Sequence, residues 1–380
     1  MKEPQHYLKC GYEDVGYKSP ELSSSEIYTD YIKKEVEDSV KKIQSHQSYD
    51  TVTFAFMTDL HLALNYNHNI RMKRTINAYK EIAKRVHIDK LILGGDYTNE
   101  GCKEYKSDCF RELRALFDGV TYYPVNGNHD DGSIWDKAYI KADKSTNHLT
   151  HEEMYNLFYN HLPSCGAEFD ENNHSLYYMY NDNVKKTRYI FIDACDIPYT
   201  FNEDGKLVYY AQWLFAMSQK QIDWLTNAAL KFDEDGWQVM FCMHSVKLPY
   251  KKEIEEIDKN MAVLNDIISY YKNGKNCVIE ANEGDFKVKV NSDFSKYKRA
   301  EVVGFFVGDY HRDEIQKTQD DIPYVLTGNA VMYCVDNTKY TMRYDGDKSE
   351  LLFDIVTVDK KSRTIHIVRV GAGEDREVKY

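Results

Sequence analysis

The sequence has no apolar run of 18 residues or more, the length that a helix needs to cross a bilayer, so no membrane span is expected. The first 20 residues also lack the apolar segment of a secretory signal. We therefore expect a cytoplasmic protein for the sequence as given, or a secreted one if a signal peptide has been removed. Basic residues are outnumbered, with 49 Lys and Arg against 61 Asp and Glu, and the net charge is −12. That charge argues against nucleic acid or an anionic membrane as a partner.

Clustered cysteines, internal repeats and low-complexity linkers are lacking too. The eight cysteines are spread over 380 residues, and only Cys102 and Cys109 lie near each other. Several of the eight fall within apolar runs, which indicates reduced core residues. The length allows two average domains or one large domain, and the even succession of strand and helix patterns favours one.

Five apolar runs of strand length are each followed by polar residues. The runs cover 54–57, 91–93, 122–125, 239–243 and 302–307. The polar residues that follow them are, in the same order, Asp59 and His61; Asp96; Asn128, His129 and Asp130; His244; and Asp309 and His311. Ligands bind at the carboxyl ends of strands in open α/β folds. Carboxylate, amide and imidazole groups are metal ligands. The sequence therefore predicts a metal site at the edge where these strands end.

The order of these motifs is more specific than any one of them. The series Asp59-x-His61, Gly95-Asp96, Gly127-Asn128-His129-Asp130, a lone His244 and Gly308-x-x-His311 resembles the calcineurin-like metallophosphoesterase superfamily over about residues 52–315. The tail at 369–376 is similar to the closing strands of bacterial members. The resemblance implies an α/β fold, a four-layer α/β/β/α sandwich of two mixed sheets flanked by helices.

Residue periodicity predicts the elements of this fold. Helices are expected over 23–46, 71–87, 104–117, 152–161, 218–230 and 253–271, and strands over 51–57, 91–93, 120–125, 175–180, 188–193, 239–243, 302–307, 324–327, 351–358 and 364–370, with a hairpin over 278–290. Residues 1–50 would form an arm and a helix packed on the body, and 51–380 the metallophosphoesterase domain. Two stretches, 131–175 and 246–300, do not fit the strand and helix rhythm and are expected to be insertions.

The resemblance also implies a ligand set and a reaction. Asp96 would bridge two metal ions, with Asp59, His61 and His311 on the first ion and Asn128 and His244 on the second. A hydroxide between the ions would attack a phosphate monoester or diester, because metal coordination lowers the pKa of water to about 7. His129 would donate to the phosphate or leaving oxygen, oriented by Asp130. The expected protein is thus a hydrolase, a metal-dependent phosphatase of small phosphorylated substrates.

Asp309 departs from the family pattern, which has His at this place. Its carboxylate either binds the second ion directly, which favours Mn²⁺ or Fe over Zn²⁺, or contacts only other ligands and leaves that ion weak or absent. Two divalent or trivalent ions are expected, with Mn or Fe favoured and Zn possible. The alternative function is a degenerate member that serves as a binding or scaffolding module, against which the His129 and Asp130 pair argues. Arg369 and Arg376 are expected to hold the tail by salt bridges.

Overall fold

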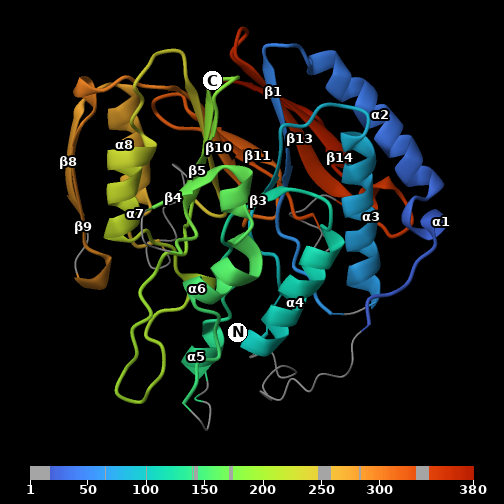
Figure 1. The fold of residues 1–380 in the computed structure, drawn as a ribbon, viewed down its shortest axis with the longest axis horizontal. Coiled ribbons are helices and arrows are strands. Elements are labelled where there is room, and N and C mark those ends of the chain that lie inside the picture. The colour runs from blue at the N-terminus through green and yellow to red at the C-terminus, as the bar shows by residue number, and fades with distance from the viewer. Residues whose placement is uncertain are drawn as a thin grey trace.

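The fold is described from a computed structural model that covers residues 18–64, 66–99, 101–138, 140, 144–170, 174–246, 258–281, 284–330 and 342–380. Two large mixed sheets occupy its centre, and helices lie on both outer sides (Figure 1). The expected α/β class and its four-layer arrangement are confirmed.

The first sheet has six strands in the order β15-β14-β13-β1-β2-β3. Their bounds are β1 Thr51–Met57, β2 Lys90–Leu93, β3 Tyr122–Pro124, β13 Leu352–Asp359, β14 Thr364–Gly371 and β15 Arg376–Lys379. β1 and β2 pair in parallel, as do β2 and β3, while β13 joins β1 antiparallel. Every residue of β1 is buried, as expected for a strand covered on both faces.

The second sheet has seven strands in the order β11-β12-β10-β7-β6-β5-β4. Their bounds are β4 Ala167–Phe169, β5 Tyr178–Asp182, β6 Thr187–Ile192, β7 Gln238–Met243, β10 Glu301–Val307, β11 Glu314–Lys317 and β12 Pro323–Leu326. The central strands β6, β7, β10 and β12 are parallel, and antiparallel strands lie at both edges. A separate hairpin pairs β8 Asn276–Ala281 with β9 Val288–Asp293.

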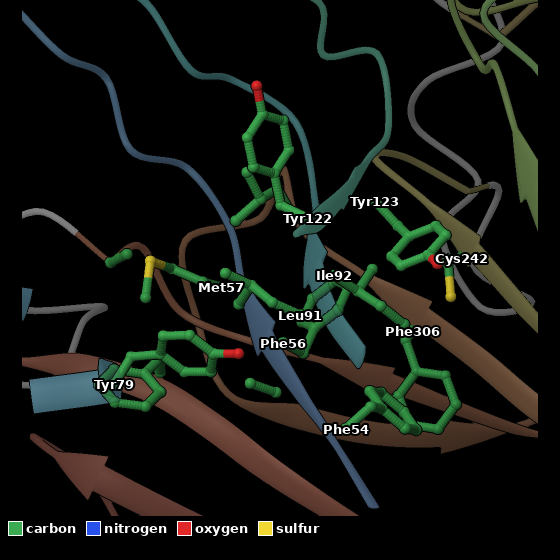
Figure 2. Close-up of a cluster of buried hydrophobic side chains, with 14 of the residues drawn as sticks. Phe54, Phe56, Met57, Tyr79, Leu91, Ile92, Tyr122, Tyr123, Cys242 and Phe306 are labelled. Carbon is green, nitrogen blue, oxygen red and sulfur yellow. The ribbon is translucent and has the colours of Figure 1, made fainter. Parts of the chain in front are cut away.

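The two sheets pack face to face through aromatic side chains. Phe54 of β1 meets Phe306 of β10 with ring centroids 4.8 Å apart and planes at 88° (Figure 2). The ring of Tyr189 in β6 lies 6.0 Å from the Phe54 ring. Edge-to-face pairs of this kind add about 0.5–1.5 kcal/mol to the burial of each ring. Alternation along β7 places Met240 and Cys242 in this inner core and their neighbours against the outer helices.

The helices cover the outer faces. They are α1 Ser24–Ile27, α2 Asp30–His46, α3 Tyr66–Ala83, α4 Lys103–Leu116, α5 Ile134–Ala138, α6 His151–Met154, α7 Gln219–Trp224 and α8 Ala262–Lys272. In Figure 1, α2 and α3 lie beside the first sheet, and α7, α8 and the β8–β9 hairpin lie beside the second. Ile32, Val36 and Ile43 of α2 are fully buried at helical spacing, and Glu35 accepts a hydrogen bond from the Gly371 backbone in β14.

Several elements differ from the sequence prediction. The single helix expected over 23–46 is two helices, because the chain is extended at Thr29, which is the N-cap of α2. α6 and α7 each continue into a π-helical turn, at Tyr155–Tyr159 and Leu225–Ala229. β4 lies within the 131–175 stretch yet extends the second sheet, and β11 and β15 were not predicted. The arm at 1–17 and residues 253–257 of the helix expected over 253–271 fall outside the described residues.

The cysteines and the hydropathy of the helices agree with the sequence expectations. Six described cysteines are free, including Cys102 and Cys109, and five of the six are buried. None of the helices in the described ranges combines the length and the apolar character that a membrane crossing requires.

Candidate metal centre

The polar residues that follow five strands meet where those strands end. Asp59 and His61 follow β1, Asp96 follows β2, Asn128 and His129 follow β3, His244 follows β7, and Asp309 and His311 follow β10. A backbone hydrogen bond from Ala330 N–H to the Thr58 carbonyl, at 2.8 Å, joins a loop of the second sheet to a loop of the first, and another from Gly308 N–H to the His244 carbonyl, at 3.0 Å, joins two loops of the second sheet. The face-to-face packing of the sheets thus brings both sets of loops to one place.

The backbone at this place is unusual. Five non-glycine residues have φ between 41° and 63°, in the left-handed region, and they are Asp59, His61, Asp96, Asp309 and His311. Such a conformation costs about 1–3 kcal/mol per residue and persists where the surroundings enforce it, often at functional sites. Gly127 meets a further constraint, because a Cβ there would collide with the Asp96 backbone and carboxylate. The backbone is therefore built around the positions of these side chains.

Four side chains form the first half of the candidate metal centre. One ligand atom from each of Asp59, His61, Asp96 and His311 lies within 4.8 Å of the others. The His61 and His311 Nε2 atoms face each other at 3.0 Å, and His311 Nε2 lies 3.1 Å from an Asp59 oxygen. Asp59 is fixed by the Thr58 hydroxyl at 2.7 Å and by the Asp309 backbone N–H at 3.2 Å.

A second half lies on the other side of Asp96. His244 Nε2 is 2.9 Å from the Asn128 Oδ1, 3.3 Å from Asp96 Oδ1 and 3.9 Å from Asp309 Oδ1. The other Asp96 oxygen, Oδ2, lies 3.5 Å from His61 Nε2. The Asp96 carboxylate therefore has one oxygen toward each half. All seven residues expected as ligands converge, and the remaining Asp309 oxygen accepts the Ser245 hydroxyl at 2.7 Å.

The protonation states of His61 and Asp96 fit metal binding. His244 Nδ1 donates to the Gly94 carbonyl at 2.7 Å, so Nε2 faces Asp96 and Asn128. Burial acts the other way, but Asp96 and Asp59 raise the pKa of His244 well above its usual range, so a metal ion at Nε2 would displace a proton there. Burial lowers the pKa of His61 to about 3, which keeps its ring neutral. Burial opposes the ionisation of Asp96, but His244 and His129 outweigh it and hold the pKa of Asp96 well below its usual range. Neutral imidazoles and ionised carboxylates are the forms that bind metal.

His129 and Asp130 take different places from each other. The His129 imidazole lies at the open side, 23% exposed, with Nε2 4.0 Å from Asp96 Oδ2. The Asp130 carboxylate is fully buried and accepts the backbone N–H groups of Tyr97, Thr98 and Gly127 at 2.8–3.1 Å. The sequence expected Asp130 to orient the His129 ring, whereas its hydrogen bonds go to the backbone. Any effect of Asp130 on the ring therefore acts through the loop.

Three supporting residues escaped the sequence argument. Thr58 and Ser245 bind the two aspartates through their hydroxyls, and both directly neighbour a predicted ligand in the sequence, which was the available signal. Lys106 of α4 is buried, and its ammonium donates to the Thr98 hydroxyl at 3.1 Å, to the Asn99 carbonyl at 2.8 Å and to the His129 carbonyl. A lysine on an amphipathic helix gives no local signal that it points inward.

Fold and site together define an α/β/β/α sandwich with candidate metal ligands at the strand ends. The family model for calcineurin-like phosphoesterases matches residues 52–248, more than half of the chain. The chain belongs to the calcineurin-like phosphoesterase family. Its family-level class is therefore that of metal-dependent phosphoesterases, as the motif order predicted.

Solved structures share the fold at low sequence identity. A dimetal phosphatase from Danio rerio is 13% identical with a TM-score of 0.53, and the match covers 87% of this chain and 99% of that one. GAP50, the anchor in the inner membrane complex of Plasmodium, is 11% identical with a TM-score of 0.44, over 87% of this chain and 88% of that one. No curated protein sequence matches the chain. At such identities the first likeness shows the fold alone.

Proposed function

We propose that the protein hydrolyses a phosphate monoester or diester at a centre of two metal ions. The observation that carries this proposal is the position of Asp96, whose two oxygens face His61 and His244 at 3.5 and 3.3 Å. A carboxylate with one oxygen toward each of two ligand groups is suited to bridge two ions.

The two ligand groups differ in chemistry. The first would consist of Asp59, His61 and His311 with Asp96, and the second of Asn128 and His244 with Asp96. We assign Asp309 to the second group as a direct ligand through Oδ1, because its Oδ2 is engaged by Ser245 while Oδ1 lies 3.9 Å from His244 Nε2. Three carboxylates make the set harder and favour Mn or Fe over Zn.

The chain's own residues set the direction of substrate approach. Asp59, His61, Asp96 and His244 are at most 3% exposed, whereas His129, Asp309 and His311 are 21–24% exposed. The buried set forms a floor, and His129 stands at the open side, where its imidazole would donate a proton or hydrogen bond to the phosphate or the leaving oxygen. When bound, the metal ions supply Lewis acidity and lower the pKa of water.

The same proposal covers the substrate class. The net charge of −12 and the absence of a basic stripe from the sequence favour a small phosphorylated molecule over nucleic acid. We assign the choice of that molecule to the 131–175 and 246–300 stretches, which depart from the repeating strand and helix order. A binding or scaffolding module remains the competing function, and it requires no turnover.

Two variants test the proposal. Asp96→Asn should lose metal and activity together, because an amide cannot supply two anionic oxygens. His129→Ala should keep its metal and lower turnover by about 10²-fold or more, the usual scale for a positioned acid or donor. Metal content and hydrolysis of a panel of mono- and diesters are measured for both, with His87→Ala, an exposed histidine paired with Asp89, as the control.

The outcomes separate the candidate functions. Turnover by the wild type that falls in both variants supports the phosphoesterase. Wild-type protein that binds metal yet hydrolyses no ester of the panel would favour the binding module. Equal loss of metal in His129→Ala would show that His129 is a ligand and that its assigned role is wrong.

A further inference from the structure

A second cluster of metal-ligand side chains lies apart from the candidate metal centre. One ligand atom from each of His151, Asp193 and Asp196 lies within 4.8 Å of the others. His151 is the first residue of α6, and the two aspartates follow β6. Asp193 directly succeeds Ile192, so it stands at the same kind of strand end as the ligands of the candidate metal centre.

The three side chains converge without pairing with one another. Within the described part of the chain, the His151 imidazole makes no hydrogen bond or ion pair, and its ring contact is with Tyr199, at 5.4 Å between centroids. A cation bonded at about 2.0–2.6 Å to two groups places their atoms at most about 4–5 Å apart. No hydrogen bond or ion pair within the described residues joins His151 to either aspartate, so ligand atoms that all lie within 4.8 Å of one another suit an ion between the groups.

The aspartates are also held in place with free oxygens. Asp193 is 1% exposed, and its Oδ1 accepts Asn126 Nδ2 at 3.0 Å and Cys195 N–H at 2.9 Å, while Oδ2 accepts no donor from the described residues. Asp196 Oδ2 accepts hydrogen bonds from Ser218 and Gln221, whereas Asp196 Oδ1, like Asp193 Oδ2, accepts none from the described residues. These two oxygens, one on each aspartate, are therefore available to bind a cation.

Among the described residues, neither Asp193 nor Asp196 forms an ion pair with a lysine or arginine. Burial, together with the charge of Asp196, raises the pKa of Asp193 to about 6 even though His151 opposes the shift. Two neighbouring carboxylates, one of them 1% exposed, thus lie together without a paired lysine or arginine among the described residues.

We propose that His151, Asp193 and Asp196 bind a divalent cation, separate from the ions of the candidate metal centre. One imidazole nitrogen and two carboxylate oxygens on one side of an ion form a set typical of Mn²⁺, Fe²⁺ or Zn²⁺, with water completing the coordination. The cation would join the start of α6 to the end of β6.

This site is connected to the loop that carries Asn128 and His129. Asn126, whose amide donates to Asp193 at 3.0 Å, lies two residues before Asn128. Gln221 of α7 fixes the same strand end, since it accepts the Asp193 N–H and donates to the Asp193 carbonyl, both at 2.9 Å. A cation here would therefore hold in place the loop that supplies two residues of the candidate metal centre.

Counting bound Mn²⁺ tests the proposal without using activity. Mn²⁺ is titrated calorimetrically into wild type, His151→Gln and Asp196→Asn, after apo-protein preparation. Each variant should bind one Mn²⁺ fewer per chain than wild type, while the ions of the candidate metal centre still bind. The control is His174→Gln, which removes an exposed histidine that lies 3.8 Å from Glu152 of α6. This variant should bind as many ions as wild type.

A second titration makes the test independent of the candidate metal centre. Asp96→Asn weakens Mn²⁺ binding at the candidate metal centre, and this variant should still bind one Mn²⁺ per chain. The double variant Asp96→Asn with His151→Gln should lose that ion. The proposal would be overturned if His151→Gln and Asp196→Asn each bound Mn²⁺ with the wild-type number of ions and the wild-type affinity. It would also be overturned if the ion that remains in Asp96→Asn were still bound in the double variant that adds His151→Gln. If neither single variant folds, absence of any residual Mn²⁺ in Asp96→Asn likewise overturns it.

Discussion

We expect the buried Lys106 to contribute more to the free energy of unfolding than any exposed lysine does. Its ammonium is 1% exposed and joins the loop after β2, at Thr98 and Asn99, to the loop after β3, at His129. Lys106→Met keeps most of the side-chain volume and removes the three donors. The substitution therefore tests how far the two loops depend on one buried charge.

The size of the effect follows from the three bonds and from burial. A hydrogen bond from a charged donor contributes about 1.5–3 kcal/mol, so three set an upper bound of roughly 5–9 kcal/mol. Removal of the ammonium also relieves a desolvation penalty of several kcal/mol, so the net loss in unfolding free energy should be about 2–4 kcal/mol. Because the His129 carbonyl loses its partner, turnover should fall by about 10- to 100-fold. Metal content should stay unchanged.

Lys103 is the matched control, since it lies one turn earlier on the same helix. Its ammonium is 27% exposed and pairs with Glu153 at 2.5 Å, so Lys103→Met should cost about 0.2–1 kcal/mol. Urea unfolding of wild type and both variants measures the difference, alongside metal content and turnover. Equal unfolding free energies for Lys106→Met and Lys103→Met would refute the reasoning.

Two further predictions concern other aspartates. Asp309→Ala should lose one ion and keep the other, and Asp309→His should move the ion preference toward Zn²⁺; metal analysis that finds two ions in Asp309→Ala with unchanged preference would contradict direct ligation. Asp354→Asn should lower the unfolding free energy at neutral pH by up to about 3–5 kcal/mol, because it removes one of the two carboxylates that pair with the buried Arg369, the one at 2.8 Å, and leaves only Asp313. Although burial acts the other way, Arg369 and Arg376 lower the pKa of Asp354, so its stabilisation is present above about pH 4 and is lost as pH falls through the lowered pKa. The unfolding free energy measured with urea should therefore change less between about pH 5 and about pH 3 in Asp354→Asn than in wild type. An equal dependence of the unfolding free energy on pH in the two proteins would contradict this.

The C-terminal tail shows how sequence and structure divide the information. Arg369 and Arg376 were expected to hold the tail, and they do so through Asp354 and Asp313, with Arg369 Nη2 2.6 Å from Asp313 Oδ1. Arg369 was visible in the sequence because it lies in a predicted strand, and Arg376 because it ends the tail stretch 369–376 that resembles the family. Their partners were not, because ion pairs across neighbouring strands depend on register, which periodicity does not report.

By itself the sequence determined the alternating and continuous apolar runs, the polar residues behind them and the order of the motifs. These are local features, and since parallel strands end at one edge of a sheet, they sufficed to predict both the family and the residues that converge on Asp96. Only the tertiary structure decided which groups those residues contact. It turned the Asp130 carboxylate to three backbone N–H groups, buried Lys106 between two loops, and brought His151 to Asp193 and Asp196. Each of these depends on how elements distant in the chain pack against each other, and side-chain patterns along one element carry no record of that packing.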